Sequence, residues 1–244
     1  MGGKTIIDAE RVGPVADKGA GDYVTDVDRA SERAIAGFLF EATPRIPVVG
    51  EEHGGTAGER YWLVDPLDGT TNFVHGFPIV AVSVALIEDG RPVAGAVAAP
   101  FLAECYVAAT GRGARLERDG RPARTLGVSE RPAERSIVGT GFPFRHKDVL
   151  PRYVRAMTAA LDRFEDLRRP GAAALDLAWV AAGVFDGFFE LSLSPWDVAA
   201  GGLLIEEAGG VVTDWAGSAG YLEGDILAGN QAVHEALLSI AADG

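Results

Sequence analysis

The sequence predicts a fold of mixed class, α+β in its first portion and α/β in its second. Three observations predict it: an amphipathic helix near the start, hairpin signals between apolar runs, and alternating helices and strands beyond about residue 133. We place a first portion at residues 1–132 and a second at 133–244. Since no repeat, low-complexity run or long linker separates them, we expect the two portions to pack rigidly.

The first portion is expected to contain a helix followed by a largely antiparallel sheet. Apolar residues recur at helical intervals over 28–42, opposite charged side chains, which predicts the helix. The short apolar runs 46–50 and 61–64 are typical of buried strands, and carboxylates follow each of them. Asp89-Gly90, between two longer apolar runs, favours positive φ and predicts a hairpin, and Asp119-Gly120 repeats the signal.

In the second portion, helices are expected to alternate with strands. Gly209-Gly210 marks the end of one of these helices, because glycine readily adopts the conformation that follows a helix. The predicted helices are 148–163, 171–183, 196–208 and 231–242, and the predicted strands are 187–191, 211–213 and 226–228.

Composition excludes several classes of function. A net charge of −13 with a pI near 4.7 disfavours binding to nucleic acid or to an anionic membrane, because both need clustered cations. The single Cys105 cannot form an internal disulfide, and no Cys and His cluster has the spacing of a zinc site. The start lacks an apolar signal core and no later segment is apolar enough to cross a bilayer, so we expect a cytoplasmic protein.

The most informative segment is WLVDPLDGTTNF, in which an apolar strand is expected to deliver Asp65 and Asp68 into a tight turn. Carboxylates suit hard divalent cations, and the carbonyl of Leu67 between them could supply one more oxygen. The amides of Gly69 and Thr70, at the start of the next helix, would face an anion. Each Asp-Pro or Asp-Gly taken singly is an ordinary turn, but together at a strand end they indicate a metal and phosphate site.

Three further acids are candidates with structural alternatives. Glu51 follows a strand end, although a surface acid after a turn would look the same. Asp197 lies at the start of a helix, where capping explains it about as well. Asp28 is three residues after Thr25, so a capping box explains it equally.

Several segments together resemble the inositol monophosphatase family. The likeness runs from about Lys18 to the end of the chain, with the motifs in the order that the family has. They are DYVTDVD at 22–28, GEE at 50–52, WLVDPLDGTTNFVHGFP at 62–78, RRPGAAALDLAWVAAG at 168–183 and WDVAAGGLLIEEAGG at 196–210.

The resemblance implies a layered αβαβα sandwich, of the type shared with fructose-1,6-bisphosphatases, and two or three Mg²⁺ ions, with Mn²⁺ as a substitute. Glu51, Asp65 and the Leu67 carbonyl would hold the first ion. Asp65, Asp68 and Asp197 would hold the second, and a third would bind near Glu51. A homodimer is also implied.

The same resemblance implies roles in catalysis and in substrate binding. Asp28 and Thr70 would orient and deprotonate the attacking water, with Glu51 as a further catalytic group. Glu190 would bind a substrate hydroxyl, unless it is only an edge-strand acid. The full set of expected substrate contacts is Gly69, Thr70, Gly171, Ala172, Ala173, Glu190 and Asp197.

The resulting functional hypothesis is a Mg²⁺-dependent phosphomonoesterase for myo-inositol monophosphate. Relatives often carry Ser or Thr where this chain has Ala172, which puts the preference for inositol in question. Alternatives are a phosphatase for fructose 1,6-bisphosphate, histidinol phosphate or 3'-phosphoadenosine phosphates, since fold does not choose among them. A rival from another class is a regulatory protein that binds RNA or a transcription complex.

Overall fold

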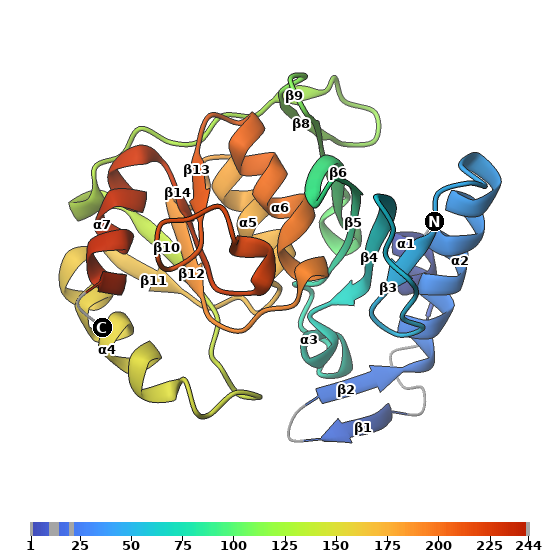
Figure 1. The fold of residues 1–244 in the computed structure, drawn as a ribbon, viewed down its shortest axis with the longest axis horizontal. Coiled ribbons are helices and arrows are strands. Elements are labelled where there is room, and N and C mark those ends of the chain that lie inside the picture. Colours follow the sequence, from blue (N-terminus) through green and yellow to red (C-terminus); the bar gives the residue numbers. More distant parts are fainter. Residues whose placement is uncertain (1, 10–14, 20–21, 243–244) are drawn as a thin grey trace.

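The structure, a computed structural model, describes residues 2–9, 15–19 and 22–242. Helices and sheets alternate in five layers (Figure 1). Helices α1 and α2 cover the outer face of a seven-stranded sheet, α5 and α6 lie between that sheet and a five-stranded sheet, and α4 and α7 cover the far side. The expected layered αβαβα fold is therefore confirmed.

The seven-stranded sheet is antiparallel except at one edge. Its strands follow the order β3-β4-β5-β6-β7-β8-β9, and only β3 and β4 run parallel. The bounds are β3 Val48–Gly50, β4 Arg60–Asp68, β5 Ala81–Glu88, β6 Arg91–Ala99, β7 Glu104–Ala109, β8 Ala114–Glu117 and β9 Arg124–Thr125.

The hairpin between β5 and β6 turns at the predicted Asp-Gly pair. Asp89 has φ of 50° and Gly90 has φ of 75°, and positive values at both central positions suit the twist of the flanking strands. Gly120, between β8 and β9, also has a positive φ, of 69°. Both predicted hairpins are confirmed.

The five-stranded sheet is mixed, in the order β11-β10-β12-β14-β13. Strand β10 is parallel to both its neighbours, whereas β14 is antiparallel to β12 and β13. The bounds are β10 Ile137–Thr140, β11 Asp166–Arg168, β12 Gly187–Glu190, β13 Val211–Thr213 and β14 Ile226–Gly229.

The helices agree with the predicted ranges to within a few residues. Their bounds are α1 Gly2–Asp8, α2 Asp26–Ala42, α3 Thr70–Val74, α4 Leu150–Arg163, α5 Ala173–Ala181, α6 Pro195–Glu207 and α7 Gln231–Ala242. In the described part of the chain, no helix combines the length and the apolarity needed to cross a membrane.

A short hairpin precedes Asp28. Strand β2 (Asp22–Thr25) pairs antiparallel with β1 (Val15–Gly19), and α2 begins at Asp26. Residues 20 and 21 lie outside the described residues. The hairpin therefore leads directly into the helix that carries Asp28.

Small residues let α5 and α6 fit between the sheets. A Cβ at Gly201 of α6 would lie only 2.5 Å from the Leu177 Cβ of α5, and one at Gly95 of β6 would lie 3.1 Å from Ala200. One buried apolar cluster includes residues of both sheets and of both helices. The two portions thus share a core, while the boundary at 132/133 stays a prediction.

Candidate active site

The segment from Asp65 to Asp68 is the end of β4, not a turn after it. The predicted strand stopped at residue 64, but pairing with β5 continues to Asp68 across a bulge, because Asp65 faces Ser83 and Asp68 faces Ala81. Such a bulge re-aims side chains beside a site. Asp65 is 1% exposed, and its Oδ1 accepts the amide of Leu67 at 2.9 Å.

Asp197 reaches the same place from the first turn of α6. The Ser83 hydroxyl of β5 donates to the Trp196 carbonyl at 2.9 Å, which ties the start of α6 to the strand beside Asp65. The Asp65 and Asp197 carboxylates are close enough to affect each other's pKa. Asp197 also forms the expected capping box, in which its Oδ2 accepts the Ser194 amide at 2.8 Å.

Asp68 caps α5 from outside that helix. Ala172 at the N-cap has no side-chain hydrogen bond, whereas Asp68 Oδ2 accepts the amide of Ala174 at 2.7 Å. The amides of Ala173 and Leu175 also stabilise this carboxylate. An acid from the seven-stranded sheet thus completes the N-terminus of a helix in the second portion.

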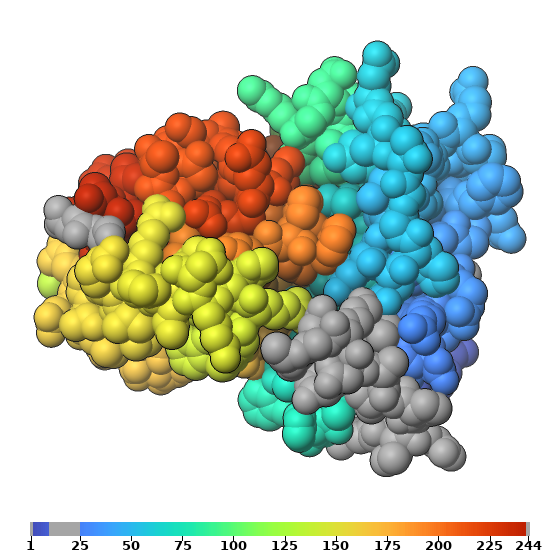
Figure 2. Space-filling view, turned by 60° about the horizontal axis from the view of Figure 1, so that its bottom comes forward, coloured from blue at the N-terminus to red at the C-terminus, as the bar shows by residue number. Residues whose placement is uncertain are grey.

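Glu51 brings a fourth acid to this group. It follows β3, and its amide donates to the Val64 carbonyl of β4 at 3.2 Å. Figure 2 shows the chain around residues 190–200, in orange, against the chain around residues 50–60, in cyan. The charges of Glu51, Asp68 and Asp197 all act on Asp65, so these four acids, called the acid cluster below, lie near one another.

The pKa values of these acids report how crowded they are. Burial, followed by the charges of Glu51, Asp68 and Asp197, holds the pKa of Asp65 well above its usual range. Burial and then the charge of Asp197 raise the pKa of Asp68 to about 7. Burial raises the pKa of Asp197 to about 6, against hydrogen bonds from Ser194 and Asp65 that lower it. Acids so close together need protons or cations to offset their repulsion.

The donor set suits a hard divalent cation, although its side chains now make other bonds. Within the described residues, no three His, Cys, Asp or Glu side chains already stand in an arrangement that could hold one metal ion. Three of the carboxylates instead accept backbone amides, as described above. Oxygen ligands with concentrated negative charge in a buried place are nevertheless what Mg²⁺ and Mn²⁺ prefer.

Asp28 and Thr70 are in contact, as the family resemblance implied. The Thr70 hydroxyl lies 3.1 Å from Asp28 Oδ1 and 3.0 Å from the Leu67 carbonyl oxygen. Asp28 Oδ2 accepts the amide of Thr25 at 2.8 Å, so the predicted capping box is also present. Burial raises the pKa of Asp28, against hydrogen bonds from Thr25 and Thr70.

Gly69 joins the acid-bearing strand to the expected substrate wall. Its φ is 86°, and a Cβ there would lie 3.0 Å from the Ile79 carbonyl oxygen and 3.3 Å from the Ala172 Cβ. Asn72, in α3, donates to the carbonyls of Ile79 at 2.7 Å and Pro170 at 2.9 Å. Nothing in the local sequence around Asn72 indicates a partner 98 residues away.

Glu190 lies at the end of β12 and is partly buried. Burial and then the charge of Asp197 raise its pKa to about 8, while Arg169 and Arg145 lower it. A Cβ at Gly141 would lie only 2.0 Å from its carboxylate, so β10 ends directly against it.

Asp176 is an acid that sequence reasoning missed. It is 1% exposed, and its Oδ1 has no hydrogen-bond partner among the described residues. Burial, followed by the charges of Asp68 and Glu190, raises its pKa well above the usual range. The available signal was a lone acid in the otherwise apolar segment AALDLAWVA of α5.

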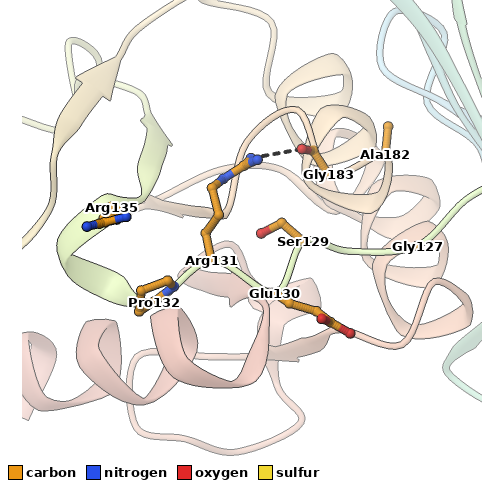
Figure 3. A pocket seen from close by; sticks show the side chains of 8 residues that line it. All are labelled: Gly127, Ser129, Glu130, Arg131, Pro132, Arg135, Ala182 and Gly183. Atoms are coloured by element: carbon orange, nitrogen blue, oxygen red, sulfur yellow. Dashed lines mark hydrogen bonds between the residues drawn. The ribbon is translucent and has the colours of Figure 1, made fainter.

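A cavity of about 710 Å³ lies elsewhere, between residues 127–135 and 182–183 (Figure 3). Arg131 reaches across it and donates to the Gly183 carbonyl at 2.9 Å, and it also pairs with the buried Asp186. None of the clustered acids lines this cavity. One of its two arginines, Arg131, is engaged in holding the fold, and we do not take this cavity as the candidate active site.

Comparisons with known proteins agree with this fold. The Nus factor SuhB of Pseudomonas aeruginosa is 46% identical over 233 residues, which cover 92% of this chain and 84% of that protein. The crystal structure of suhB from Bartonella henselae is 38% identical, with a TM-score of 0.92, and covers 100% of this chain and 94% of that one. SaIMPase-II of Staphylococcus aureus, solved with inositol monophosphate, is 30% identical with a TM-score of 0.77, covering 89% and 86%.

The layered fold and the buried acids at the end of β4 point to a class of α/β protein with a carboxylate-rich candidate site. A model of the inositol monophosphatase family matches residues 3–243. The chain belongs to the inositol monophosphatase family, and this membership supports phosphatase activity.

Proposed function

We propose that this protein is a Mg²⁺-dependent phosphomonoesterase that hydrolyses a small phosphorylated polyol, with myo-inositol monophosphate as the leading substrate. The observation that carries the proposal is the convergence of Glu51, Asp65, Asp68 and Asp197, whose charges act on one another inside the protein. Burying so many like charges would be costly without a cationic ligand.

The proposed metal ligands are these four acids and the Leu67 carbonyl, for two or three ions. Mg²⁺ or Mn²⁺ bound there would neutralise phosphate oxygens, acidify water and stabilise the leaving alkoxide. Cations bound there would displace protons from Asp65, Asp68 and Asp197, whose pKa values are raised.

Asp28 and Thr70 are proposed to handle the attacking water. The Thr70 hydroxyl can accept a hydrogen bond from water while its own proton points to Asp28 Oδ1, 3.1 Å away. The water proton would pass through this hydroxyl to Asp28, whose raised pKa makes it a better acceptor. Thr25 holds the second Asp28 oxygen, so the acceptor keeps its orientation. Glu51 is proposed to assist as a further catalytic group.

The phosphate and the polyol are proposed to bind on either side of Gly69. The amides of Gly69 and Thr70 would donate to the phosphate. The Gly171–Ala173 wall, which contacts Gly69, would line the polyol pocket. Glu190 would accept a substrate hydroxyl when ionised, and Asp197 would contact the same ring.

A panel of esters tests the substrate. We expect kcat/KM in Mg²⁺ to be at least tenfold higher for inositol 1-phosphate than for fructose 1,6-bisphosphate, histidinol phosphate or 3'-phosphoadenosine phosphates; tenfold corresponds to about 1.4 kcal/mol of transition-state binding. A tenfold preference for another ester would replace inositol phosphate as the substrate. No turnover of any ester would remove the phosphatase proposal itself.

A second candidate function is regulatory, because relatives of this chain are named Nus factor SuhB. We propose Asp68→Asn to separate the two. Loss of phosphate release with full rescue of a deletion strain would favour a role in a transcription complex. Loss of both would favour catalysis. The homodimer and the cytoplasmic location remain proposals, which light scattering and fractionation would test.

A further inference from the structure

Helix α2 carries a buried stripe of polar side chains that face the acid cluster. Asp28, Ser31 and Glu32 lie three and four residues apart, so they share one face of the helix. They are 1%, 0% and 2% exposed. Polar groups are rarely buried without partners, so this stripe indicates specific contacts in place of apolar packing.

Each member of the stripe contacts a different segment of the site. Asp28 meets Thr70, as described above. The Ser31 hydroxyl donates to the Pro66 carbonyl at 2.9 Å, inside the bulged end of β4. Glu32 accepts from His53, in the loop that carries Glu51: its Oε2 lies 2.5 Å from the ring Nδ1, and its Oε1 lies 3.4 Å from the backbone amide.

The contact of Glu32 extends to the glycine before Glu51. A Cβ at Gly50 would lie 1.5 Å from Glu32 Oε1 and 2.6 Å from its Cδ, so the carboxylate fills the place of a side chain at that position. Gly50 and Gly54 exchange two backbone hydrogen bonds, of 2.9 and 3.0 Å, which close the loop between them. The Glu32 carboxylate therefore presses against one end of this loop and binds His53 in the middle.

We propose that Glu32 is a positioning residue, which sets the direction of Glu51 by holding the 50–54 loop through Gly50 and His53. This inference rests on the proposed role of Glu51 as a metal ligand. Groups that orient a ligand typically change metal affinity by about 10- to 100-fold when removed. Glu32 contacts Gly50 and His53, which lie on either side of Glu51 in the chain.

Mn²⁺ binding, measured by calorimetry on the full chain without substrate, tests the inference. We expect Glu32→Ala to raise the Mn²⁺ Kd at least tenfold, about as much as Glu51→Gln does. The double variant with Glu32→Ala and Glu51→Gln should bind Mn²⁺ no more weakly than Glu51→Gln alone, because both changes act on the same metal ligand.

Three further variants guard against a purely structural effect. Asp186→Ala removes a buried carboxylate that also binds a backbone amide and a basic side chain, but far from the acids. It should lose stability and keep the Mn²⁺ Kd within twofold. Glu32→Gln, which keeps volume and one acceptor, should give an intermediate Kd. His53→Ala leaves Glu32 in place and should weaken Mn²⁺ binding less than Glu32→Ala does. If Glu32→Ala does not fold, Glu32→Gln and His53→Ala test the positioning role.

The outcomes separate this inference from the proposed function. Suppose that Glu51→Gln weakens Mn²⁺ binding but Glu32→Ala leaves the Mn²⁺ Kd within twofold of wild type; the positioning role is then wrong. If Glu32→Ala does not fold, the same conclusion follows when Glu32→Gln and His53→Ala both leave the Kd within twofold. Additive losses in the double variant would also overturn it. If Glu51→Gln leaves Mn²⁺ binding unchanged, the metal role of Glu51 fails, and the inference fails with it.

Discussion

Asp28 and Asp197 of the candidate site each combine a helix cap with a second contact. Asp28 Oδ2 accepts the Thr25 amide in the cap of α2, while its Oδ1 lies next to the Thr70 hydroxyl. Asp197 caps its own helix and lies close to Asp65. The capping interpretation and the functional interpretation of these residues were therefore never exclusive. A helix N-terminus fixes the direction of a carboxylate, which is useful when its second oxygen must act.

At Thr70, we expect the hydroxyl and not the side-chain volume to matter. Thr70→Ala should lower kcat about 100-fold or more at saturating Mg²⁺, because the proton path to Asp28 is lost. Thr70→Ser keeps the hydroxyl and should stay within about tenfold of wild type. Steady-state phosphate release measures both, and equal losses in the two variants would contradict the proposed path.

At Asp68, we expect a pH-dependent stability in the metal-free protein. Its pKa is raised from 3.8 to about 7, so the folded state binds a proton more tightly than the unfolded state does. The stability that this proton gives at low pH is lost as the pH rises through 7 and the buried acid ionises. In EDTA, wild type should therefore lose melting temperature between pH 6 and 8.5. The melting temperature of Asp68→Asn should fall less over this range and should be about 5 °C higher than that of wild type at pH 8.5. A melting temperature below that of wild type would contradict this expectation.

At the scale of elements, the site depends on bonds between segments that are distant in the chain. Asp68 of β4 caps α5, Ser83 of β5 holds the start of α6, and Asn72 of α3 holds the wall before α5. Each bond crosses from the first portion to the second. A change in any one of them should act on both stability and substrate binding.

Asn72→Ala tests this coupling. Nδ2 donates to the carbonyls of Ile79 and Pro170, and leaving both unpaired should cost about 1–3 kcal/mol of unfolding free energy. The substrate KM should also rise, because the Gly171 wall loses its tie to α3. Asn230→Ala is a matched control, since this buried Asn also donates twice, to Ser129 and Arg131, away from the acids. Urea unfolding and steady-state kinetics should show similar destabilisation but an unchanged KM for the control.

At the scale of the whole molecule, the acid cluster joins the two sheets. Glu51, Asp65 and Asp68 come from the seven-stranded sheet and its edge, whereas Asp197 comes from a helix that packs against both sheets. Metal binding is therefore expected to stabilise the whole fold and not one lobe.

We expect the melting temperature to rise with Mg²⁺ concentration. At 100 times the Kd, a single bound ion adds about 2.7 kcal/mol to the unfolding free energy. Asp197→Asn should reduce this rise, because one ligand is lost and the link between the sheets weakens. Scanning calorimetry measures both; equal melting temperatures with and without Mg²⁺ would contradict a metal site at the cluster.

Local patterns in the sequence were sufficient for most of the helices, for two hairpins and for some of the candidate residues. Apolar periodicity located α2, α4 and α7, the Asp-Gly pairs located two turns, and acids after strand ends marked Asp65 and Asp68. The end of β4 was misplaced, because Pro66 and Gly69 resemble a turn when only neighbours in sequence are considered. Pairing with β5 extends the strand through them, and that pairing is not a local property.

The sequence by itself determined the fold class, the capping acids and, through resemblance, the family. Only the tertiary structure decided which acids meet, that Asp68 caps a helix of the other portion, and that Glu32 lies over Gly50. The physical reason is range: helix and turn preferences arise between residues a few positions apart, whereas the raised pKa values arise from burial and from charges brought close by packing.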